Sequence, residues 1–432
     1  MGPITSVSGM ISGRTRNPLS FPAYRRLFGA RAVSSAGSYM QIVATTWYAF
    51  TITGSAAAVG LLAALALGPS IVGGPIGGVL ADRFEPRRLA MLLYLLQGIP
   101  AALLAIMELT GHLPMGWLYA LVFAGAIPYS LNCPVISLVG PYTVPEEYRP
   151  AALAQSSMMF NITRLAGAVI GGFIVHWIGI GAAFTFNAAS YFLVAAVLAG
   201  TPLVSDMRRT RDPNRSTRAG AVSGRAADGA GVSGVASLVR LVKVTAVGVG
   251  VFFVFVAPVE QLMPMVAMEH GLMASDVGLL IGAIGVGAIT ANPVIGRIGN
   301  SPQRRRRLMA TGLFLAAAGM IELAITQNHG FVVDLIGAFV IGFGWEFVFV
   351  GGQATIATEV PERVRGRMMG LFFVLVTGTT AIGAVGLGVL IDTLGLTATF
   401  LGTAVVVMAA GIALLTRPVR SPVLPAAEWT GR

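Results

Sequence analysis

The sequence has few charged residues, which make up 11% of its 432 residues. Soluble domains carry about a quarter, so this chain lacks the polar surface needed to face water on all sides. Lysine is almost absent, since Lys243 is the single one and arginine supplies the remaining basic charge. Hydrophobic residues make up 55%, and the mean hydropathy is +0.78. This composition indicates a protein that crosses a membrane many times.

Cysteine and histidine are also scarce, which excludes several classes of protein. Cys133 is the single cysteine, so no disulfide can form within the chain, and the four histidines show no spacing typical of a metal site. The sequence has no glycine-rich loop for nucleotide phosphates, and its polar N-terminal segment lacks the apolar core of a signal peptide. We therefore expect no metal, no cofactor and no enzymatic activity. Any work that the protein does must draw on an ion gradient.

Twelve apolar stretches are long enough to cross a bilayer, which takes about 20 helical residues. Backbone groups in lipid must hydrogen-bond within their own segment, so each stretch is expected to be a helix. The stretches are 28–52, 56–81, 88–109, 115–140, 153–178, 181–200, 244–267, 273–298, 307–326, 331–356, 367–391 and 397–416. We predict an all-α membrane protein with a tail (1–27), a six-helix bundle (28–200), a linker (201–243), a second six-helix bundle (244–416) and a tail (417–432).

The basic residues fall almost entirely in alternate loops. If the N-terminus is cytoplasmic, the inner segments hold 28 of the 29 basic residues and the outer loops hold none. Arg164, the remaining one, lies inside a span. This bias follows the positive-inside rule. We therefore expect a multi-pass protein of the cell membrane with both termini in the cytoplasm. The bias also accounts for the net charge of +11 without a nucleic-acid partner.

The two groups of spans repeat each other. PEEYRPAALA (145–154) and PERVRGRMMG (361–370) occupy corresponding loops at an offset of 216 residues. PIGGVLADRFEPRRLAM (75–91) and NPVIGRIGNSPQRRRRLMA (292–310) correspond at nearly the same offset. Two six-helix repeats in parallel orientation are the layout of major facilitator transporters.

The loop after the second stretch carries a specific motif. It contains Gly78, Leu80, Asp82, Arg83, Arg87 and Arg88. The motif resembles the signature loop between the second and third helices of the major facilitator superfamily. Its FEPRRL segment (84–89) resembles the variant of a branch that exports drugs and siderophores. The resemblance implies the twelve-helix fold and transport by alternating access.

Asp82 lies at the C-terminal end of its own helix, where the helix dipole disfavours an anion. Its favourable partner is therefore another helix, and the resemblance implies the eleventh, which begins after Pro361. We expect a breakable cytoplasmic latch. Its residues are Gly78, Asp82, Arg83, Arg87, Arg88, Arg365 and Arg367. The alternative for the arginines is a purely topological role.

Three ionisable residues lie deep in the spans: Arg164, Glu260 and Glu346. A charge in lipid costs a few kcal/mol, so each calls for a functional explanation. The alternatives are a structural ion pair between Arg164 and Glu346, and contact of Glu260 with outer water. The exporter branch usually has an acid where this chain has Ser38. Glu346 and Glu260 are therefore the candidates for proton coupling.

Polar and aromatic residues of the spans are candidates for a substrate cavity. They are Arg164, Asn161, Gln41, Tyr39, Trp47 and Gln353. Aromatic walls suit bulky amphipathic ligands, although any one of these side chains could instead pack between helices or face lipid.

These observations predict a monomeric, proton-coupled exporter of a bulky organic compound, whose partners are its small-molecule substrate, protons and the lipid bilayer. A nutrient importer of the same fold and a non-transporting membrane sensor are the alternatives.

Overall fold

The computed structural model describes residues 17–201, 246–298, 301–325, 330–360 and 362–416, and none of these is in a β-strand. Most of the predicted linker and of both predicted tails lies outside the described residues.

The first half of the chain contains the first six spans. Its helices are α1 (Pro22–Thr53), α2 (Ala56–Leu67), α3 (Ser70–Arg83), α4 (Pro86–Leu109), α5 (Met115–Val139), α6 (Arg149–Trp177) and α7 (Ile180–Gly200). Short 3-10 helices lie at Pro18–Ser20 (η2), Pro141–Thr143 (η3) and Glu146–Tyr148 (η4). The helices α2 and α3 together form one span that is interrupted at Gly68 and Pro69.

The second half of the chain contains the other six spans. They are a bent span made of Ala246–Glu260 and α10 (Met263–Glu269), then α11 (Ala274–Ile298), α12 (Pro302–Ile325), α13 (Phe331–Glu359), α14 (Glu362–Leu394) and α15 (Leu396–Thr416).

By length and composition, the described residues contain ten candidate membrane spans, or eleven when the bent pair is counted as one. The helix α1 is the twelfth. Its 32 residues reach about 48 Å at 1.5 Å each, but serines, threonines and a glutamine make it less apolar than the others. The predicted all-α fold of twelve spans is confirmed. Most helices begin and end within four residues of their predicted stretches, whereas α1, α12 and α14 begin five or six residues earlier.

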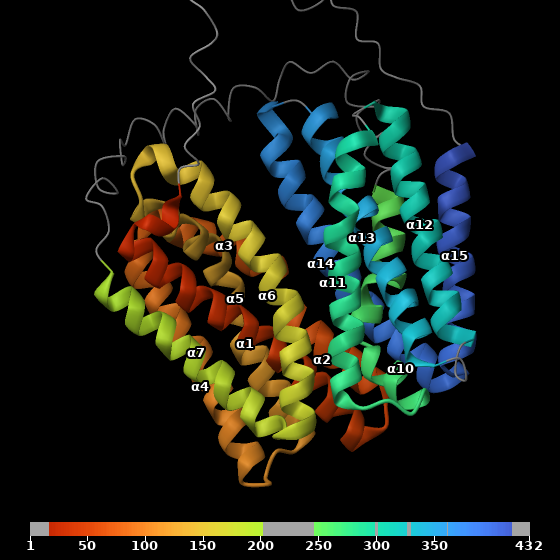
Figure 1. Cartoon of the computed structure of the whole chain (residues 1–432), viewed down its shortest axis with the longest axis horizontal. Helices are drawn as coiled ribbons and strands as arrows, with labels where there is room; N and C mark the ends of the chain where they lie inside the picture. Colours follow the sequence, from red (N-terminus) through yellow and green to blue (C-terminus); the bar gives the residue numbers. More distant parts are fainter. Residues whose placement is uncertain (1–16, 202–245, 299–300, 326–329, 361, 417–432) are drawn as a thin grey trace, which may run out of the picture.

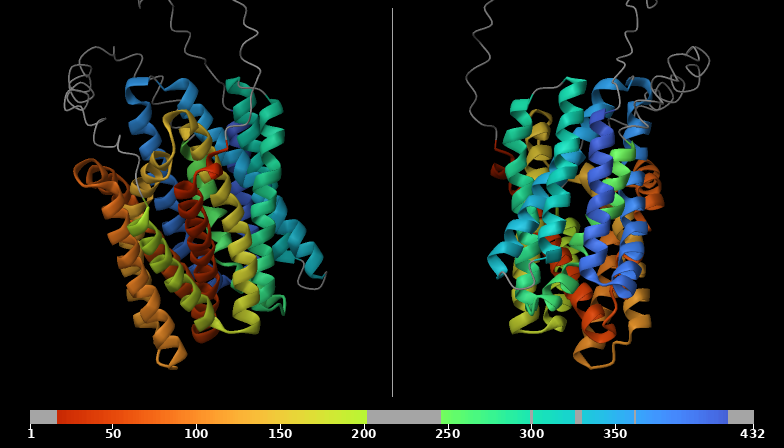
Figure 2. Two further views of the ribbon diagram at one scale, coloured as in Figure 1. Left: turned by 60° about the vertical axis from the view of Figure 1, so that its left-hand side comes forward. Right: turned by 90° about the vertical axis from the view of Figure 1, so that its right-hand side faces the viewer.

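The helices form two bundles, one from each half of the chain (Figure 1; Figure 2). In the first, α1 packs on α6 and α7, and α4 packs on α5 and α7. In the second, α13 packs on α11 and α12, and α12 packs on α15. When the two halves are aligned, α4–α5 and α4–α7 correspond to α12–α13 and α12–α15, and α3–α5 corresponds to α11–α13. The sequence repeat is therefore also a structural one.

Two arginines show the repeat at the level of single contacts. Arg87, at the start of α4, donates from Nε to the carbonyl of Leu198 at the end of α7, over 2.8 Å. Arg306, at the start of α12, donates to the carbonyl of Leu415 at the end of α15, also over 2.8 Å. Each arginine therefore satisfies a free carbonyl at a helix C-terminus, where a cation is favoured.

The bundles contact each other mainly through two helix pairs, α2 with α14 and α6 with α11. They lie together at one end and diverge toward the other (Figure 1). Helices α1, α4, α6, α12 and α14 begin at the diverging end, which we call the arginine-rich end. The opposite end, where α2 and α11 begin, we call the closed end.

Candidate functional site

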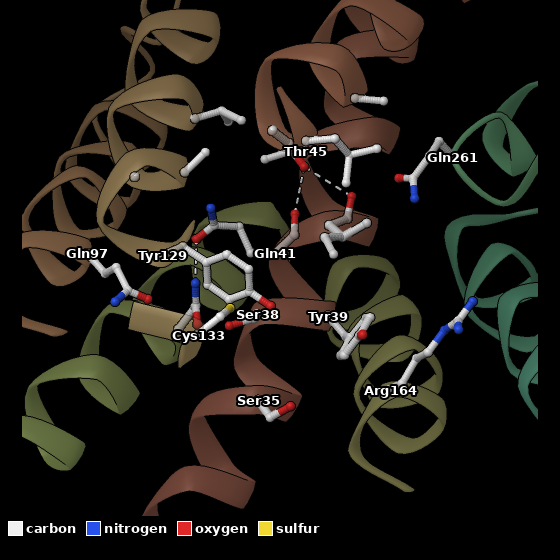
Figure 3. Close-up of a pocket in the computed structure, with 18 of the residues that line it drawn as sticks. Ser35, Ser38, Tyr39, Gln41, Thr45, Gln97, Tyr129, Cys133, Arg164 and Gln261 are labelled. Carbon is white, nitrogen blue, oxygen red and sulfur yellow. Dashed lines mark hydrogen bonds between the residues drawn. The ribbon is translucent and has the colours of Figure 1, made fainter. Parts of the chain in front are cut away.

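A cavity of about 540 Å³ lies between the two bundles. Helices α1, α2, α4, α5, α6 and α7 of the first half supply most of its wall. Fewer residues come from the bent span, α13 and α14. Figure 3 shows part of the lining, from Gln97 on one side to Arg164 and Gln261 on the other. It extends along α1 from Arg31 to Thr46, which is about 22 Å of helix. This volume is within the usual range for small-molecule pockets.

One face of α1 forms a polar stripe along the cavity. Its residues, at helical spacing, are Arg31, Ser34, Ser35, Ser38, Gln41 and Thr45. The hydroxyl of Thr45 donates to the carbonyl of Gln41 over 2.8 Å, which satisfies its proton within the helix and leaves its lone pairs free to accept. The side-chain oxygen of Gln41 accepts from the Asn187 amide over 2.6 Å. These bonds hold the polar groups in place on the cavity wall.

An ion pair crosses the cavity between the two halves. Arg164, near the middle of α6, donates to the carboxylate of Glu260. Their side chains are 20% and 10% exposed, so neither charge is well solvated. The guanidinium carbon also lies 5.2 Å from the centre of the Trp345 ring on α13, in a cation–π contact. Arg164 therefore joins three helices at the point where the bundles face each other.

Glu260 lies at a break in its own span. Residues Ala257–Glu260 form a 3-10 helix (η6), and the helical segments on either side are bent by 53°. Pro258 and Pro264 remove backbone donors there, which prevents a regular helix. Discontinuous helices of this kind line the substrate and ion sites of many transporters.

The second half supplies an aromatic wall. The ring of Trp345 lies 5.4 Å from that of Phe253 in an edge-to-face contact, and 5.7 Å from that of Phe252. Of these, Phe253 and Trp345 reach the cavity. The cavity thus has a polar stripe on α1 and an aromatic pair on the second half, and both halves add further polar and apolar residues to its wall.

Four of the predicted residues line this cavity, namely Gln41, Tyr39, Arg164 and Glu260.

Three predicted cavity residues lie outside this lining. Phe160 lines the cavity, and the next residue, Asn161, is rotated by about 100° around α6 and is exposed. Trp47 packs against the hydrophobic core beside α1. Gln353 lies eight residues beyond the cavity residue Trp345, or about 12 Å further along α13.

The ion pair considered for Arg164 and Glu346 forms with Glu260 instead, because the break in the bent span brings that carboxylate to Arg164. Glu346 lies outside the cavity lining, with the side chain of Asn292 as its hydrogen-bond neighbour.

The cavity also contains residues that the sequence did not single out. Buried amides line it on three helices: Gln97 on α4, Asn132 on α5 and Asn187 on α7. Isolated amides in apolar spans are the signal that could have identified them. Within the described residues, no three His, Cys, Asp or Glu side chains gather to hold a metal ion.

The closed end is held by close helix crossings. A Cβ on Gly172 of α6 would lie 2.8 Å from the carbonyl oxygen of Ala274 and 2.9 Å from the Cα of Gly278 on α11. A Cβ on Gly60 of α2 would lie 2.1 Å from the carbonyl oxygen of Ala384 on α14. Only glycine allows backbones to approach this closely.

A carboxylate joins the halves at the same end. Asp392, near the C-terminus of α14, accepts from the Ser55 hydroxyl (2.6 Å) and from the backbone amides of Ala56 (2.7 Å) and Ala57 (3.0 Å). It thereby caps the N-terminus of α2, where a negative charge is favoured. Nothing in the sequence around Asp392 indicates this distant partner, so the residue could not be singled out without the structure.

The predicted latch residues lie at the arginine-rich end. Asp82 is in the last turn of α3, as expected. Arg87 caps α7, and Arg88 forms an exposed ion pair with Glu85 over 2.8 Å. On the second half, Arg365 donates to the carbonyl of Val360 over 3.3 Å. The latch role itself stays a prediction, as it does for Gly78, Arg83 and Arg367.

Comparison with known proteins gives matches over most of the chain. A family of transmembrane secretion effectors matches residues 14–428. The uncharacterized MFS-type transporter YfiS of Bacillus subtilis is 23% identical over 386 residues, covering 87% of this chain and 88% of its own. Macrolide efflux protein A of Streptococcus pyogenes is 22% identical over 391 residues, with coverage of 89% and 93%.

The enterobactin exporter EntS of Escherichia coli O127:H6 is 27% identical over 372 residues and covers 85% of each chain. Among solved structures, the nucleoside transporter NupG superposes with a TM-score of 0.71 at 11% identity, covering 92% of this chain and all of its own. That likeness supports the fold alone.

Proposed function

This chain belongs to the transmembrane secretion effector family of major facilitator transporters, and from that premise we propose that it is a proton-coupled exporter of a bulky organic compound. It is a multi-pass membrane transporter and not an enzyme. The proposal concerns its direction, its coupling ion and its substrate class. The observation that carries it is the ion pair between Arg164 and Glu260, which bridges the two bundles across the cavity.

The arrangement of the bundles supports alternating access. The halves meet at the closed end through Gly172, Gly278 and the Asp392 cap, and they diverge toward the arginine-rich end. The positive-inside rule assigns the arginine-rich end, and with it both termini, to the cytoplasm. The described conformation is then the inward-facing one, in which substrate enters the cavity from the cytoplasm.

Glu260 is the better placed of the two candidate proton acceptors. It lines the cavity and holds Arg164, whereas Glu346 lies outside the lining. Protonation would neutralise the carboxylate and remove its attraction for Arg164, so the halves would lose a contact that belongs to one conformation. A proton can shift a conformational equilibrium only by such a difference between states.

The cavity walls support a bulky, amphipathic substrate. Hydrogen-bonding groups of α1 face one side, and Phe253 and Trp345 provide an apolar surface on the other. The relatives named for macrolide efflux and for enterobactin export suggest the same outward direction.

The test is accumulation of a compound panel in cells with and without the gene, with and without a protonophore. We expect lower accumulation of at least one compound, abolished by the protonophore and by Glu260→Gln. Glu146→Gln is the matched control, because Glu146 is exposed and lies outside the cavity lining. Full gradient-driven export by Glu260→Gln, with normal amounts of protein in the membrane, would refute the coupling role. Uptake in place of export would make the protein an importer.

A further inference from the structure

The cavity lining contains more positive than negative side chains. Among the described residues, its lining contains three charged side chains: Arg31, Arg164 and Glu260. The carboxylate of Glu260 is held by Arg164. No described carboxylate lies within salt-bridge distance of Arg31. The described lining therefore carries one positive charge that the protein does not neutralise.

Arg31 belongs to the cavity and not to the surface of the bundle. It is the tenth residue of α1, about 14 Å along the helix from Pro22. It begins the polar stripe that continues through Ser34, Ser38 and Gln41, and it is half-buried. A guanidinium in such a place is poorly screened by water, so it attracts an anion more strongly than an exposed one does.

Tyrosine side chains of the first half line the same cavity as Arg31. Tyr94 is an electrostatic neighbour of Arg31. The rings of Tyr94 and Tyr191 lie 6.2 Å apart, each residue is 8% exposed, and both line the cavity together with Tyr129. The flat faces and hydroxyls of tyrosine suit an aromatic body that carries polar groups.

We propose that Arg31 is the anion-recognition subsite of the cavity, so that the transported molecule is an organic anion with an acidic group on an aromatic or otherwise apolar body. The acidic group pairs with the guanidinium, which can bind a carboxylate through two parallel hydrogen bonds. The apolar body extends toward Phe253 and Trp345 on the opposite wall. This inference rests on the proposed function and names the substrate class of the same cavity.

Arg31 also has a structural neighbour, since a Cβ on Gly140, at the C-terminus of α5, would lie 3.4 Å from its Nη1 atom. A role limited to holding α5 would predict that Arg31 substitutions change stability. It would not predict discrimination between charged and neutral ligands. The experiment therefore measures discrimination.

The test uses the purified full chain and three probes with one ring system: 1-naphthylacetate, its methyl ester and 1-naphthylethylamine. Binding is followed at neutral pH by tryptophan quenching, with Trp345→Phe to identify the signal from the cavity. We expect the wild type to bind the acid at least tenfold more tightly than the ester or the amine. Arg31→Gln should remove that preference while leaving the ester unchanged, and Arg31→Lys should keep part of it.

Arg26→Gln is the matched control, because Arg26 is an exposed arginine of the same helix and lies outside the cavity lining. It should leave all three affinities unchanged. The probe ranking in the wild type needs no variant, so a poorly folded Arg31→Gln does not block the test. Equal binding of the probes, binding of none of them, or an unchanged preference in a folded Arg31→Gln would overturn the inference.

The exporter proposal has a separate outcome. Export of a neutral compound that depends on Glu260 would keep that proposal while this inference fails. Binding that discriminates as expected, without gradient-driven transport of any compound, would remove the exporter proposal and keep the subsite.

Discussion

Replacing Asp392 by alanine should open the closed end. The side chain accepts three hydrogen bonds from the start of α2, from Ser55, Ala56 and Ala57, over 2.6 to 3.0 Å. Loss of a capping acceptor costs about 0.5–2 kcal/mol, and loss of a negative charge at a helix N-terminus costs about 0.3–1 kcal/mol. Because Asp392 is exposed, water can hydrogen-bond to the freed backbone amides in the variant and reduces both costs. We therefore expect the substitution to destabilise the closed conformation by about 1–2 kcal/mol.

That free energy is lost only from the conformation in which α14 meets α2. The ratio of open to closed molecules at this end should therefore rise about 5- to 30-fold. Asp392→Asn, which keeps an acceptor but loses the charge, should give a smaller rise.

The assay is a distance distribution between spin labels at positions 52 and 394. Ile52 on α1 and Leu394 on α14 belong to different halves and are 54% and 61% exposed. Cys133 is first replaced by serine, because it is the single native cysteine. Labelled Asp392→Ala should show a larger population at long distance than the labelled parent.

Asp276→Ala is the control for the loss of a helix cap. Asp276 accepts from the backbone amide of Met273 over 2.9 Å, entirely within the second half. It should leave the distance distribution unchanged. The reasoning fails if Asp392→Ala gives the parent's distribution, or if Asp276→Ala shifts it equally.

Three further predictions concern the remaining contacts. Gly172→Ala should lower the melting temperature by several degrees in a thermal unfolding scan, because the added Cβ would contact the backbone of α11 and overpacking costs about 1–3 kcal/mol. Gly74→Ala is the control and should leave the melting temperature unchanged, because no atom lies within 4 Å of its added Cβ. Glu346→Gln should retain most gradient-driven export in the cellular accumulation assay, and a loss as complete as that of Glu260→Gln would move the proton site to Glu346. Asp82→Asn should favour separation at the arginine-rich end, and unchanged labelling of engineered cysteines there would argue against the latch.

Most of the fold could be predicted from the sequence because the signals of a membrane span are local. A run of apolar residues indicates a helix without reference to its neighbours, so the stretches predicted at 115–140 and 181–200 end within a residue of α5 and α7. The repeat was equally visible in its loop segments. The structure extends it to Arg87 and Arg306, which cap equivalent helices.

The candidate site was only partly predictable. An ionisable or amide residue within a span is conspicuous, which is why Arg164, Glu260 and Gln41 were found. The direction in which such a residue points depends on the rotation of its helix, and the sequence indicates this weakly when all sides of the helix are apolar. For that reason Asn161 and Trp47 lie outside the cavity lining, and Gln97, which lines it, was not singled out.

The sequence by itself determined the number of spans, their grouping into two halves and the concentration of arginine at one end, because each depends on composition along short segments. The tertiary structure alone decided which distant groups meet. Arg164 pairs with Glu260, 96 residues away, and Asp392 binds the amide of Ala56 across 336 residues. Such contacts depend on how the two bundles are packed, on the bend at Glu260 and on glycines that let the backbones approach. No local pattern in the chain specifies these features.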